Sequence, residues 1–363
     1  MMSQLFRLAR PLLNSLGPET AHELTLRLLE KGVYRRQRRP DDPRLHQEFW
    51  NLRFRNPIGI AAGFDKDGRV PDALIKLGFG FVEVGTVTPA PQLGNPKPRV
   101  FRLAEEHAVV NRLGFNSQGR TAVHKRLEQR SRTGVLGVNI GANKDSPNRT
   151  EDYVEGVGAF ADVADYFTVN ISSPNTPGLR ELQDPEHLNA LLSWLFAARG
   201  ALMEAGEHWR PILVKLSPDI GDQDLPSVIN CLTANDIDGI VIANTTIARE
   251  GLPDSKYKHE TGGLSGRPLF NKSTRMLARV YRMTEGKIPL IGVGGIDSGE
   301  TALTKIEAGA SLLQIYTGLI YEGPDLLKRI KRKLIAHMDA LGYNDISEVV
   351  GQKAEQWAEH GGE

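Results

Sequence analysis

Cysteine is nearly absent from this sequence, with Cys231 the single one among 363 residues. One cysteine can form neither an intramolecular disulfide nor a cysteine-built metal cluster, and its scarcity is typical of a reducing compartment. Because Cys231 lies in a helical pattern before Leu232-Thr233-Ala234, we expect a packed thiol rather than a nucleophile.

Long apolar stretches are also missing. No run approaches the roughly 18 to 20 residues that a membrane-spanning helix needs. Arg7 and Arg10 interrupt the apolar N-terminal segment, so we predict no secretory signal. The net charge of only +1 gives no global electrostatic argument for binding to nucleic acid.

The charge is unevenly distributed. Residues 1–40 contain eight Lys/Arg and three acidic residues, a net charge of +5, which leaves −4 for the remainder. Apolar stripes predict a helix over residues 3–16 and a second one from Ala21 to Gly32, with a break at Gly17-Pro18. Two short amphipathic helices followed by the arginine cluster YRRQRRP are typical of a segment that lies on an anionic membrane surface. A helical hairpin packed on the domain, with solvated arginines, is the alternative.

From Asn56 onward the sequence alternates between short apolar runs, polar loops and segments with a helical pattern. Its length allows two domains, but an α/β barrel with additions also fits. Eight alternating strands and helices are the count of a (β/α)8 TIM barrel, and several runs are apolar enough to be buried on both faces. We therefore predict this α/β fold, with a small N-terminal α-helical extension, over a doubly wound sheet. The predicted strands are Pro57–Ala61, Phe81–Val84, Val135–Ile140, Phe167–Ile171, Ile212–Leu216, Gly239–Ala243, Pro289–Val293 and Leu312–Ile315.

Functional groups of such a barrel lie at the carboxyl ends of its strands. The fourth strand leads into VNISSPNTPGLR, where Asn170, Ser172, Ser173, Asn175 and Thr176 offer neutral hydrogen-bonding groups. These groups suit a flat polar heterocycle better than a phosphate or a metal, although a self-capping turn gives a similar pattern. The strand ends contain no metal-ligand set, so we expect no metal site.

The last two strand ends, GVGGI and YTG, lie where barrels commonly bind phosphate through backbone N–H groups. Lys215, at the end of the fifth strand, suits a Schiff base or a fixed cation beside an electron-rich cofactor ring. Two connections, residues 86–134 and 245–269, are too long for plain barrel links. We expect them to build or cover the site.

The motifs form one ordered set: AAGFDKDG, EVGTVTP, GNPKPRVFRL, NRLGFNSQG, GVNIGANK, VNISSPNTPGLR, LVKLSPD, NTT, GGLSGRPL, GVGGI and QIYTGL. From about residue 50 to residue 335 the chain resembles the dihydroorotate dehydrogenase family. It is similar to the membrane-associated class 2 form, because Ser173 stands where class 1 enzymes are expected to use cysteine. The N-terminal extension also resembles the quinone-access domain of class 2.

The resemblance implies a barrel with tightly bound FMN that oxidises (S)-dihydroorotate to orotate, the fourth step of UMP (pyrimidine) biosynthesis. Electrons then pass to a membrane quinone. Ser173 is implied to be the base that removes the C5 proton while hydride leaves C6 for flavin N5. Thr176 is implied to assist the exit of the proton through a water.

Three sets of binding residues follow from the same resemblance. The FMN contacts are expected from Ala62, Gly63, Thr86, Asn139, Asn170, Lys215, Ala243, Gly266, Gly295, Tyr316 and Thr317. The substrate contacts are expected from Lys66, Asn111, Arg112, Leu113, Gly114, Phe115, Asn170, Asn175, Asn244 and Thr245. The quinone tunnel is expected at His22, Arg102 and Tyr316. Ala243 departs from the family's expected Thr, but a backbone contact to the flavin would survive that change.

The resemblance also implies a monomer without nucleic acid partners, attached peripherally to the cytoplasmic face of the inner cell membrane by its N-terminal helices. We expect a membrane and quinone-access domain over residues 1–40, an FMN-binding barrel over 41–340 and a C-terminal tail over 341–363. Two alternatives are a class 1 enzyme that uses fumarate or NAD and a catalytically idle, membrane-docked flavoprotein. Ser173 disfavours both, the basic N-terminal segment disfavours the first, and Lys66 with the amide set disfavours the second.

Overall fold

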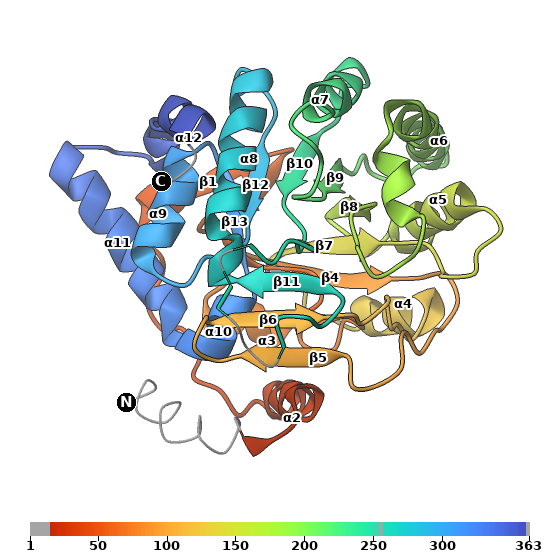
Figure 1. Cartoon of the computed structure of the whole chain (residues 1–363), viewed down its shortest axis with the longest axis horizontal. Coiled ribbons are helices and arrows are strands. Elements are labelled where there is room, and N and C mark those ends of the chain that lie inside the picture. Colours follow the sequence, from red (N-terminus) through yellow and green to blue (C-terminus); the bar gives the residue numbers. More distant parts are fainter. Residues whose placement is uncertain (1–14, 251, 254–256, 361–363) are drawn as a thin grey trace.

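Eight parallel strands close into a barrel in the computed structural model, which describes residues 15–250, 252–253 and 257–360 (Figure 1). Every predicted strand is present within three residues of its expected bounds, which confirms the barrel. The alternative of a doubly wound sheet is wrong. In order around the barrel the strands are β3 (Ile58–Ile60), β4 (Phe81–Val87), β7 (Val135–Ile140), β8 (Tyr166–Asn170), β9 (Ile212–Leu216), β10 (Gly239–Ile242), β12 (Leu290–Val293) and β13 (Leu312–Ile315).

Helices surround the barrel and bury one apolar face each against the strands (Figure 1). In α6, Pro185 occupies the first turn and the Asp184 side chain accepts the N–H of Glu186, so the start of the helix is capped. The surrounding helices are α3 (Pro71–Leu77), α4 (Arg120–Glu128), α5 (Arg149–Phe160), α6 (Pro185–Glu204), α7 (Leu225–Ala234), α8 (Phe270–Met283), α9 (Gly299–Glu307) and α11 (Asp325–Leu341). The short helix α10 (Thr317–Glu322) follows β13, and single 3-10 turns are η1 (Pro43–Leu45), η2 (Leu179–Gln183) and η3 (Arg267–Leu269). Cys231 lies on α7 and is half-buried, with its thiol donating to the Pro185 carbonyl oxygen.

Aromatic side chains close the amino-terminal end of the barrel. A hairpin of β1 (Gln47–Phe49) and β2 (Leu52–Phe54) carries Phe54, whose ring meets that of Phe81 edge to face at 5.4 Å. Tyr166 fills the space beside them. A Cβ at Gly137 would lie 2.1 Å from the Tyr166 ring, so only glycine leaves room for this ring. This floor is a packed apolar layer.

The two long connections meet in a second sheet. It consists of β5 (Val100–Leu103), β6 (Ala108–Asn111) and β11 (Gly263–Gly266), antiparallel in the order β11-β6-β5. In the register Gly263 pairs with Asn111, so segments about 150 residues apart in the chain lie side by side. The sheet lies outside the barrel, on the side where α2 is found (Figure 1).

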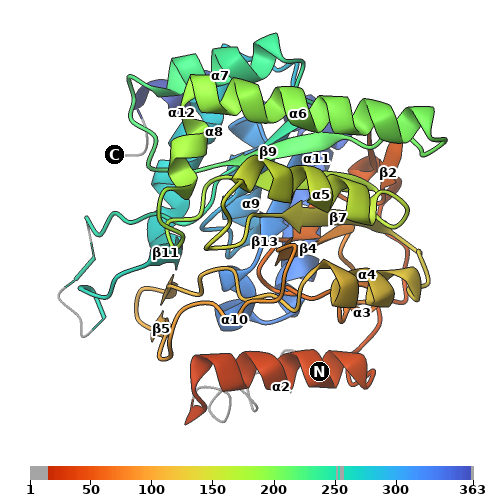
Figure 2. The same cartoon turned by 90° about the vertical axis from the view of Figure 1, so that its right-hand side faces the viewer.

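Helix α2 (Pro18–Glu30) confirms the second predicted helix but begins three residues earlier, because Pro18 occupies its first turn instead of breaking it. It lies across one end of the molecule (Figure 2). It buries Leu26 and Leu29, and its acidic groups bind Arg69 on the barrel: Glu23 at 2.7 Å and Glu30 at 2.6 Å. The helix expected over residues 3–16 lies almost wholly outside the described residues. Within the described ranges, no helix has the length and apolar character needed to cross a bilayer.

The segment after α2 is fixed to the barrel by a buried lysine. The ammonium group of Lys331 on α11 donates to Asp41 at 2.6 Å, to Gln37 at 3.0 Å and to the Gly78 carbonyl oxygen at 2.7 Å. Residues 37–41 are therefore anchored where the helical extension ends.

The C-terminal tail, for which the sequence offered no usable signal, also packs on the barrel. It forms η4 (Ile346–Val349) and α12 (Ala354–His360). Helix α12 lies against α8, where the rings of Trp357 and Phe270 meet edge to face at 5.9 Å. The tail is thus part of the outer helical layer.

Candidate active site

A cavity of about 1720 Å³ lies at the carboxyl ends of the barrel strands and continues to α2. Residues from strand ends, the second sheet and α2 all line it, so the long connections do help to build the site. The expected site residues that line it are His22, Ala62, Gly63, Lys66, Thr86, Arg102, Asn111, Leu113, Gly114, Phe115, Asn170, Ser173, Asn175, Lys215, Ala243, Asn244, Thr245, Gly266, Gly295, Tyr316 and Thr317. Asn139, Arg112 and Thr176 do not belong to its lining.

Ser173 occupies the loop that leaves β8 and is 6% exposed. Its Oγ accepts the backbone N–H of Asn175 at 3.2 Å, which leaves the hydroxyl hydrogen available to another partner. The loop is held from behind by Arg180, whose Nε donates to the Ser172 carbonyl oxygen at 3.1 Å and whose Nη2 donates to the Thr245 carbonyl oxygen at 3.3 Å. The position of Ser173 is therefore set by a guanidinium that joins the ends of two strands.

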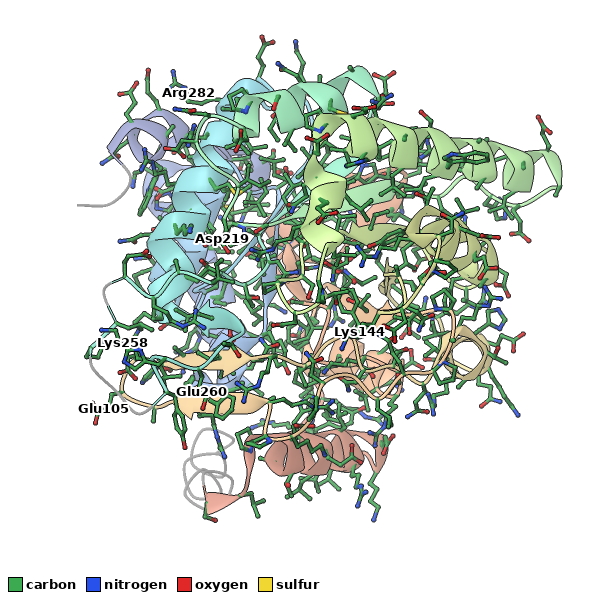
Figure 3. All side chains as sticks on the ribbon, turned by 45° about the vertical axis from the view of Figure 1, so that its right-hand side comes forward. Glu105, Lys144, Asp219, Lys258, Glu260 and Arg282 are labelled. Carbon is green, nitrogen blue, oxygen red and sulfur yellow. The ribbon has the colours of Figure 1, made fainter. Side chains whose placement is uncertain are left out.

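Asp219 completes this support. Its carboxylate accepts from Arg180 at 3.1 Å, from Lys272 on α8 at 2.7 Å and from the backbone N–H of Ile247 at 2.9 Å. Figure 3 shows Asp219 beside α8. Sequence reasoning missed both Arg180 and Asp219, because neither lies on the strand end that it serves.

A chain of amides and hydroxyls crosses the barrel mouth. The Oγ1 of Thr86 donates to the Asn139 Oδ1 at 2.6 Å, and Asn170 Nδ2 donates to Thr86 Oγ1 at 2.8 Å. Asn244 Nδ2 then reaches Ser172 Oγ at 2.9 Å and Asn170 Oδ1 at 3.3 Å. Asn139, although predicted to contact the cofactor, lies behind the lining and orients its neighbours.

This series of hydrogen bonds ends at a carboxylate in the centre of the barrel. Glu83 is fully buried and accepts from Asn139 Nδ2 at 2.8 Å and from Gln314 Nε2 at 2.7 Å. The hydroxyls of Thr168 and Tyr166 donate to it at 3.0 and 3.1 Å. Four donors are what a buried carboxylate needs to remain in an apolar interior.

Lys215 extends from β9 into the cavity wall and is 5% exposed. Burial lowers the pKa of its ammonium group, and the charge of Glu83 opposes that shift. Within the described part of the chain, no group accepts a hydrogen bond from this ammonium. An unpaired buried cation at the cavity wall fits the electron-rich edge of a flavin ring.

Two glycines bring backbone close to the cavity after β12. A Cβ at Gly295 would lie 2.4 Å from the Cβ of Phe270, and one at Gly294 would lie 2.9 Å from the Ser273 Oγ. Nearby, Thr317 Oγ1 donates to Ser265 Oγ at 2.9 Å. Backbone exposed in this way fits the phosphate of a nucleotide cofactor.

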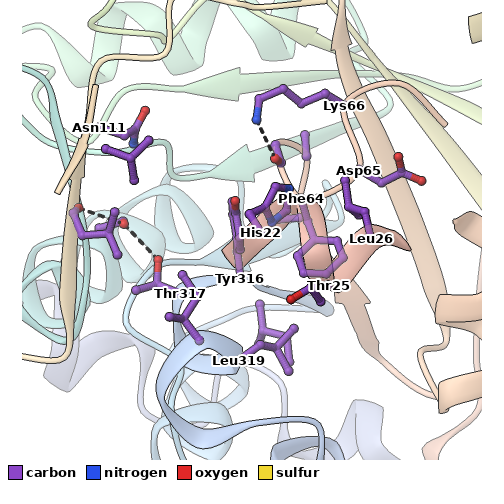
Figure 4. A pocket seen from close by; sticks show the side chains of 18 of the residues that line it. His22, Thr25, Leu26, Phe64, Asp65, Lys66, Asn111, Tyr316, Thr317 and Leu319 are labelled. Carbon is purple, nitrogen blue, oxygen red and sulfur yellow. Dashed lines mark hydrogen bonds between the residues drawn. The ribbon is translucent and has the colours of Figure 1, made fainter. Parts of the chain in front are cut away.

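The α2 side of the cavity is aromatic. The rings of Phe64 and His22 meet edge to face at 5.3 Å, and those of Phe64 and Tyr316 meet at 5.6 Å (Figure 4). Burial lowers the pKa of His22 to about 4, so this ring is neutral at pH 7. Lys66 Nζ donates to the Gly63 carbonyl oxygen at 3.0 Å, and burial lowers its pKa to about 8. Arg102 donates to the Leu16 carbonyl oxygen beside this end.

Two expected substrate residues differ in orientation. Asn111 lines the cavity and its Oδ1 accepts from Asn175 Nδ2 at 3.4 Å. The Arg112 guanidinium instead binds Glu260 at 2.6 Å and lies 4.6 Å from the Phe101 ring centroid. Its side chain is therefore engaged on the outer side of the second sheet.

One set of potential metal ligands in the described residues, formed by His124, Glu128 and Asp162, is also outside the cavity lining.

Comparison with known proteins connects this architecture to one family. The family model described as dihydroorotate dehydrogenase matches residues 44–338. The protein named dihydroorotate dehydrogenase (quinone) from Parvibaculum lavamentivorans is 52% identical over 96% of this chain and 98% of its own length. The protein of the same name from Brucella anthropi is 50% identical over 98% of both chains. A crystal structure of DHODH from Eimeria tenella in complex with ferulenol has a TM-score of 0.89 and 41% identity, and covers 93% of this chain and 95% of that chain. On this evidence the chain belongs to the dihydroorotate dehydrogenase family.

Proposed function

We propose that this protein oxidises dihydroorotate to orotate, with FMN as the hydride acceptor and a membrane quinone as the final electron acceptor. This is a step of pyrimidine biosynthesis. The observation that carries the proposal is the single cavity that joins the Ser173 loop at the barrel mouth to the aromatic wall under α2. Such a cavity gives a donor and an acceptor access to one redox group from different sides.

The barrel end suits a pyrimidine carboxylate. Amide groups of Asn111, Asn175 and Asn244 offer both donors and acceptors, as the alternating groups of the ring require. Lys66 offers the cation for the carboxylate. The substrate set comprises these residues with Asn170, Thr245 and the backbone from Arg112 to Phe115. Arg112 would act through its backbone, because its guanidinium is already bound to Glu260.

Ser173 is the proposed base that removes the proton from the substrate's C5. A serine hydroxyl is a poor base at neutral pH, so the step requires a dry and preorganised site. Burial to 6% exposure and the support from Arg180 provide both conditions. Thr176, also buried, is proposed to help the proton leave.

FMN is the proposed form of the flavin. When bound, it supplies a ring that accepts hydride from the substrate. Lys215 would lie at the ring edge where negative charge develops, and the backbone of Gly294 and Gly295 would hold the phosphate. The proposed FMN set is Ala62, Gly63, Thr86, Asn170, Lys215, Ala243, Gly266, Gly295, Tyr316 and Thr317, with Asn139 acting through Thr86 and Asn170.

The quinone is proposed to enter beneath α2, beside His22, Arg102 and Tyr316. Exposed Leu28 and Val33 lie close in sequence to the arginines of residues 35–39, a combination that suits contact with anionic lipid. We propose that residues 1–40 form this quinone-access and membrane-contact unit, that residues 41–340 form the FMN-binding barrel, and that the protein is a monomer on the cytoplasmic face of the membrane.

An absorption spectrum of the purified protein tests the function directly. We expect flavin bands that dihydroorotate bleaches without oxygen and that a soluble quinone restores. Colourless protein that FMN does not reconstitute would overturn the proposal. A fumarate-using or NAD-using enzyme of the same family is the second candidate, and faster reoxidation by fumarate or NAD than by quinone would favour it.

A further inference from the structure

Lys305 is an unusual residue because its side chain is fully buried without a counter-charge. It lies on α9, on the helix face that also buries Ala302 and Ile306. Among the described residues, no carboxylate forms an ion pair with it. Burial lowers its pKa well below the ordinary value for lysine. An ammonium group in such a place costs stability unless something nearby compensates its charge.

The contacts of the ammonium all border the glycine loop after β12. Its Nζ donates to Ser273 Oγ at 2.6 Å and reaches the Val293 carbonyl oxygen at 3.5 Å. The ring of Phe270 lies 5.4 Å away. Ser273 Oγ lies 3.2 Å from the Gly294 carbonyl oxygen. Lys305 therefore reaches the Val293 carbonyl oxygen, which also accepts the N–H of Ala243 at 3.3 Å. The Ser273 hydroxyl is shared between the carbonyl oxygens of Gly294 and, at 3.1 Å, Phe270.

This arrangement fixes where two backbone N–H groups point. In a trans peptide the C=O and the following N–H point in opposite directions. With the Val293 carbonyl group turned towards Lys305 and that of Gly294 towards Ser273, the N–H groups of Gly294 and Gly295 point the other way, and both glycines line the cavity. Within the described residues, no backbone carbonyl accepts from either N–H. Two successive free N–H groups form a site for an anion.

We propose that Lys305 is a positioning residue that makes the flavin site selective for a phosphorylated flavin. It orients the Val293–Gly295 backbone for a phosphate, and it adds a positive charge behind that backbone in a region of low dielectric constant. This inference rests on the proposed function, because it assumes that the phosphate end of the flavin lies at this loop.

The test compares FMN with riboflavin, which has the same ring but no phosphate. The full-length protein is stripped of flavin, and each flavin is titrated by fluorescence quenching. Lys305→Met keeps the length of the side chain and removes its charge. We expect about a ten- to hundredfold loss of FMN affinity, as for a lost hydrogen-bonded charge, and unchanged riboflavin affinity. Inorganic phosphate should raise the melting temperature of the wild-type apoprotein more than that of the variant.

Two further variants separate this role from a general loss of stability. Ile306→Val, on the same face of α9, removes one buried methyl group without changing charge and should leave the ratio of FMN to riboflavin affinity unchanged. Ser273→Ala removes the bridging hydroxyl and should lower FMN affinity by a smaller factor, which keeps the test open if Lys305→Met does not fold. Equal losses for both flavins, or no loss for FMN, in the Lys305 and Ser273 variants would overturn the inference. If the wild-type protein bound no FMN, the proposed function itself would fail.

Discussion

The two ends of the cavity are built by different means. At the barrel end, Ser173, in the loop after β8, and Lys215, on β9, are buried, and the Ser173 loop is held by the half-buried Arg180. At the α2 end, the helix rests on Leu26 and Leu29, on the pair of Glu19 with the buried Arg99, and on ion pairs of Glu23 and Glu30 with Arg69. The side chains of Glu23 and Glu30 are 41% and 37% exposed, and exposed pairs of this kind contribute only about 0–1 kcal/mol each.

Under the proposed function, the two half-reactions would therefore depend on different parts of the structure. The chemistry at the barrel mouth needs groups held within a fraction of an ångström, which buried hydrogen bonds between strands provide. Entry of an apolar quinone beside α2, as proposed, would depend instead on the contacts that hold this helix. A substitution at the barrel end should therefore impair flavin reduction alone, and a change at the α2 end should impair flavin reoxidation by quinone alone.

The largest effect is expected from Ser173→Ala at the barrel end. Loss of a positioned base should slow flavin reduction by dihydroorotate by about 10²- to 10⁴-fold, because general base catalysis contributes that much. Stopped-flow bleaching of the flavin without oxygen measures it. The variant should remain yellow, and reoxidation of chemically reduced flavin by quinone should be unchanged. Near-normal reduction would remove Ser173 from this role.

An intermediate effect is expected from deletion of residues 1–32, which removes α2 but keeps Gln37 and Asp41 bound to Lys331. Turnover with a lipid-soluble quinone should be lost, and binding to anionic liposomes should weaken because only the arginines of residues 35–39 remain. Reduction of a soluble dye by dihydroorotate should continue, because the barrel end is intact. Unchanged quinone turnover in the truncated protein would contradict the assignment of the α2 end.

The smallest effect concerns Lys66, which lies where the two ends meet and whose charge also helps to keep His22 neutral. Its pKa of about 8 means that the ammonium is charged below that pH and neutral above it. Binding of orotate should therefore weaken as the pH rises through about 8, by up to about tenfold per pH unit. Titration of the flavin absorbance with orotate measures this, with Lys144→Met, an exposed lysine outside the cavity lining, as the control. If the pH dependence of orotate binding keeps its inflection in Lys66→Met, the titrating group is another residue.

The barrel could be predicted because its signal is local. Each strand is a short apolar run, and each polar strand end follows directly from it, as at Asn170 and Lys215. Most of the expected site residues therefore meet in one cavity. The second sheet could not be predicted in this way, because the pairing of Gly263 with Asn111 joins segments far apart in the chain. The docking of Trp357 on α8 is likewise a tertiary contact without a local pattern.

Supporting residues were missed for a related reason. Glu83 was visible as a single acid within an apolar strand, and Lys305 as a lysine between apolar positions of a helix. Each pattern indicates a buried charge but not its partners, which come from other strands and helices. Arg180 resembled an ordinary surface arginine until its contacts with Ser172 and Asp219 were seen. Sequence reasoning therefore finds the residues that line a site more readily than those that hold them.

The aromatic floor of Phe54, Phe81 and Tyr166 has a consequence for kinetics. Because that end of the barrel is filled, both the incoming donor and the outgoing product must travel through the opposite opening, which the second sheet and α2 surround. Under the proposed function, a ligand beneath α2 would obstruct quinone entry and leave the Ser173 side of the cavity open. Inhibitors of that region should then slow reoxidation of the flavin by quinone and leave its reduction by dihydroorotate unchanged.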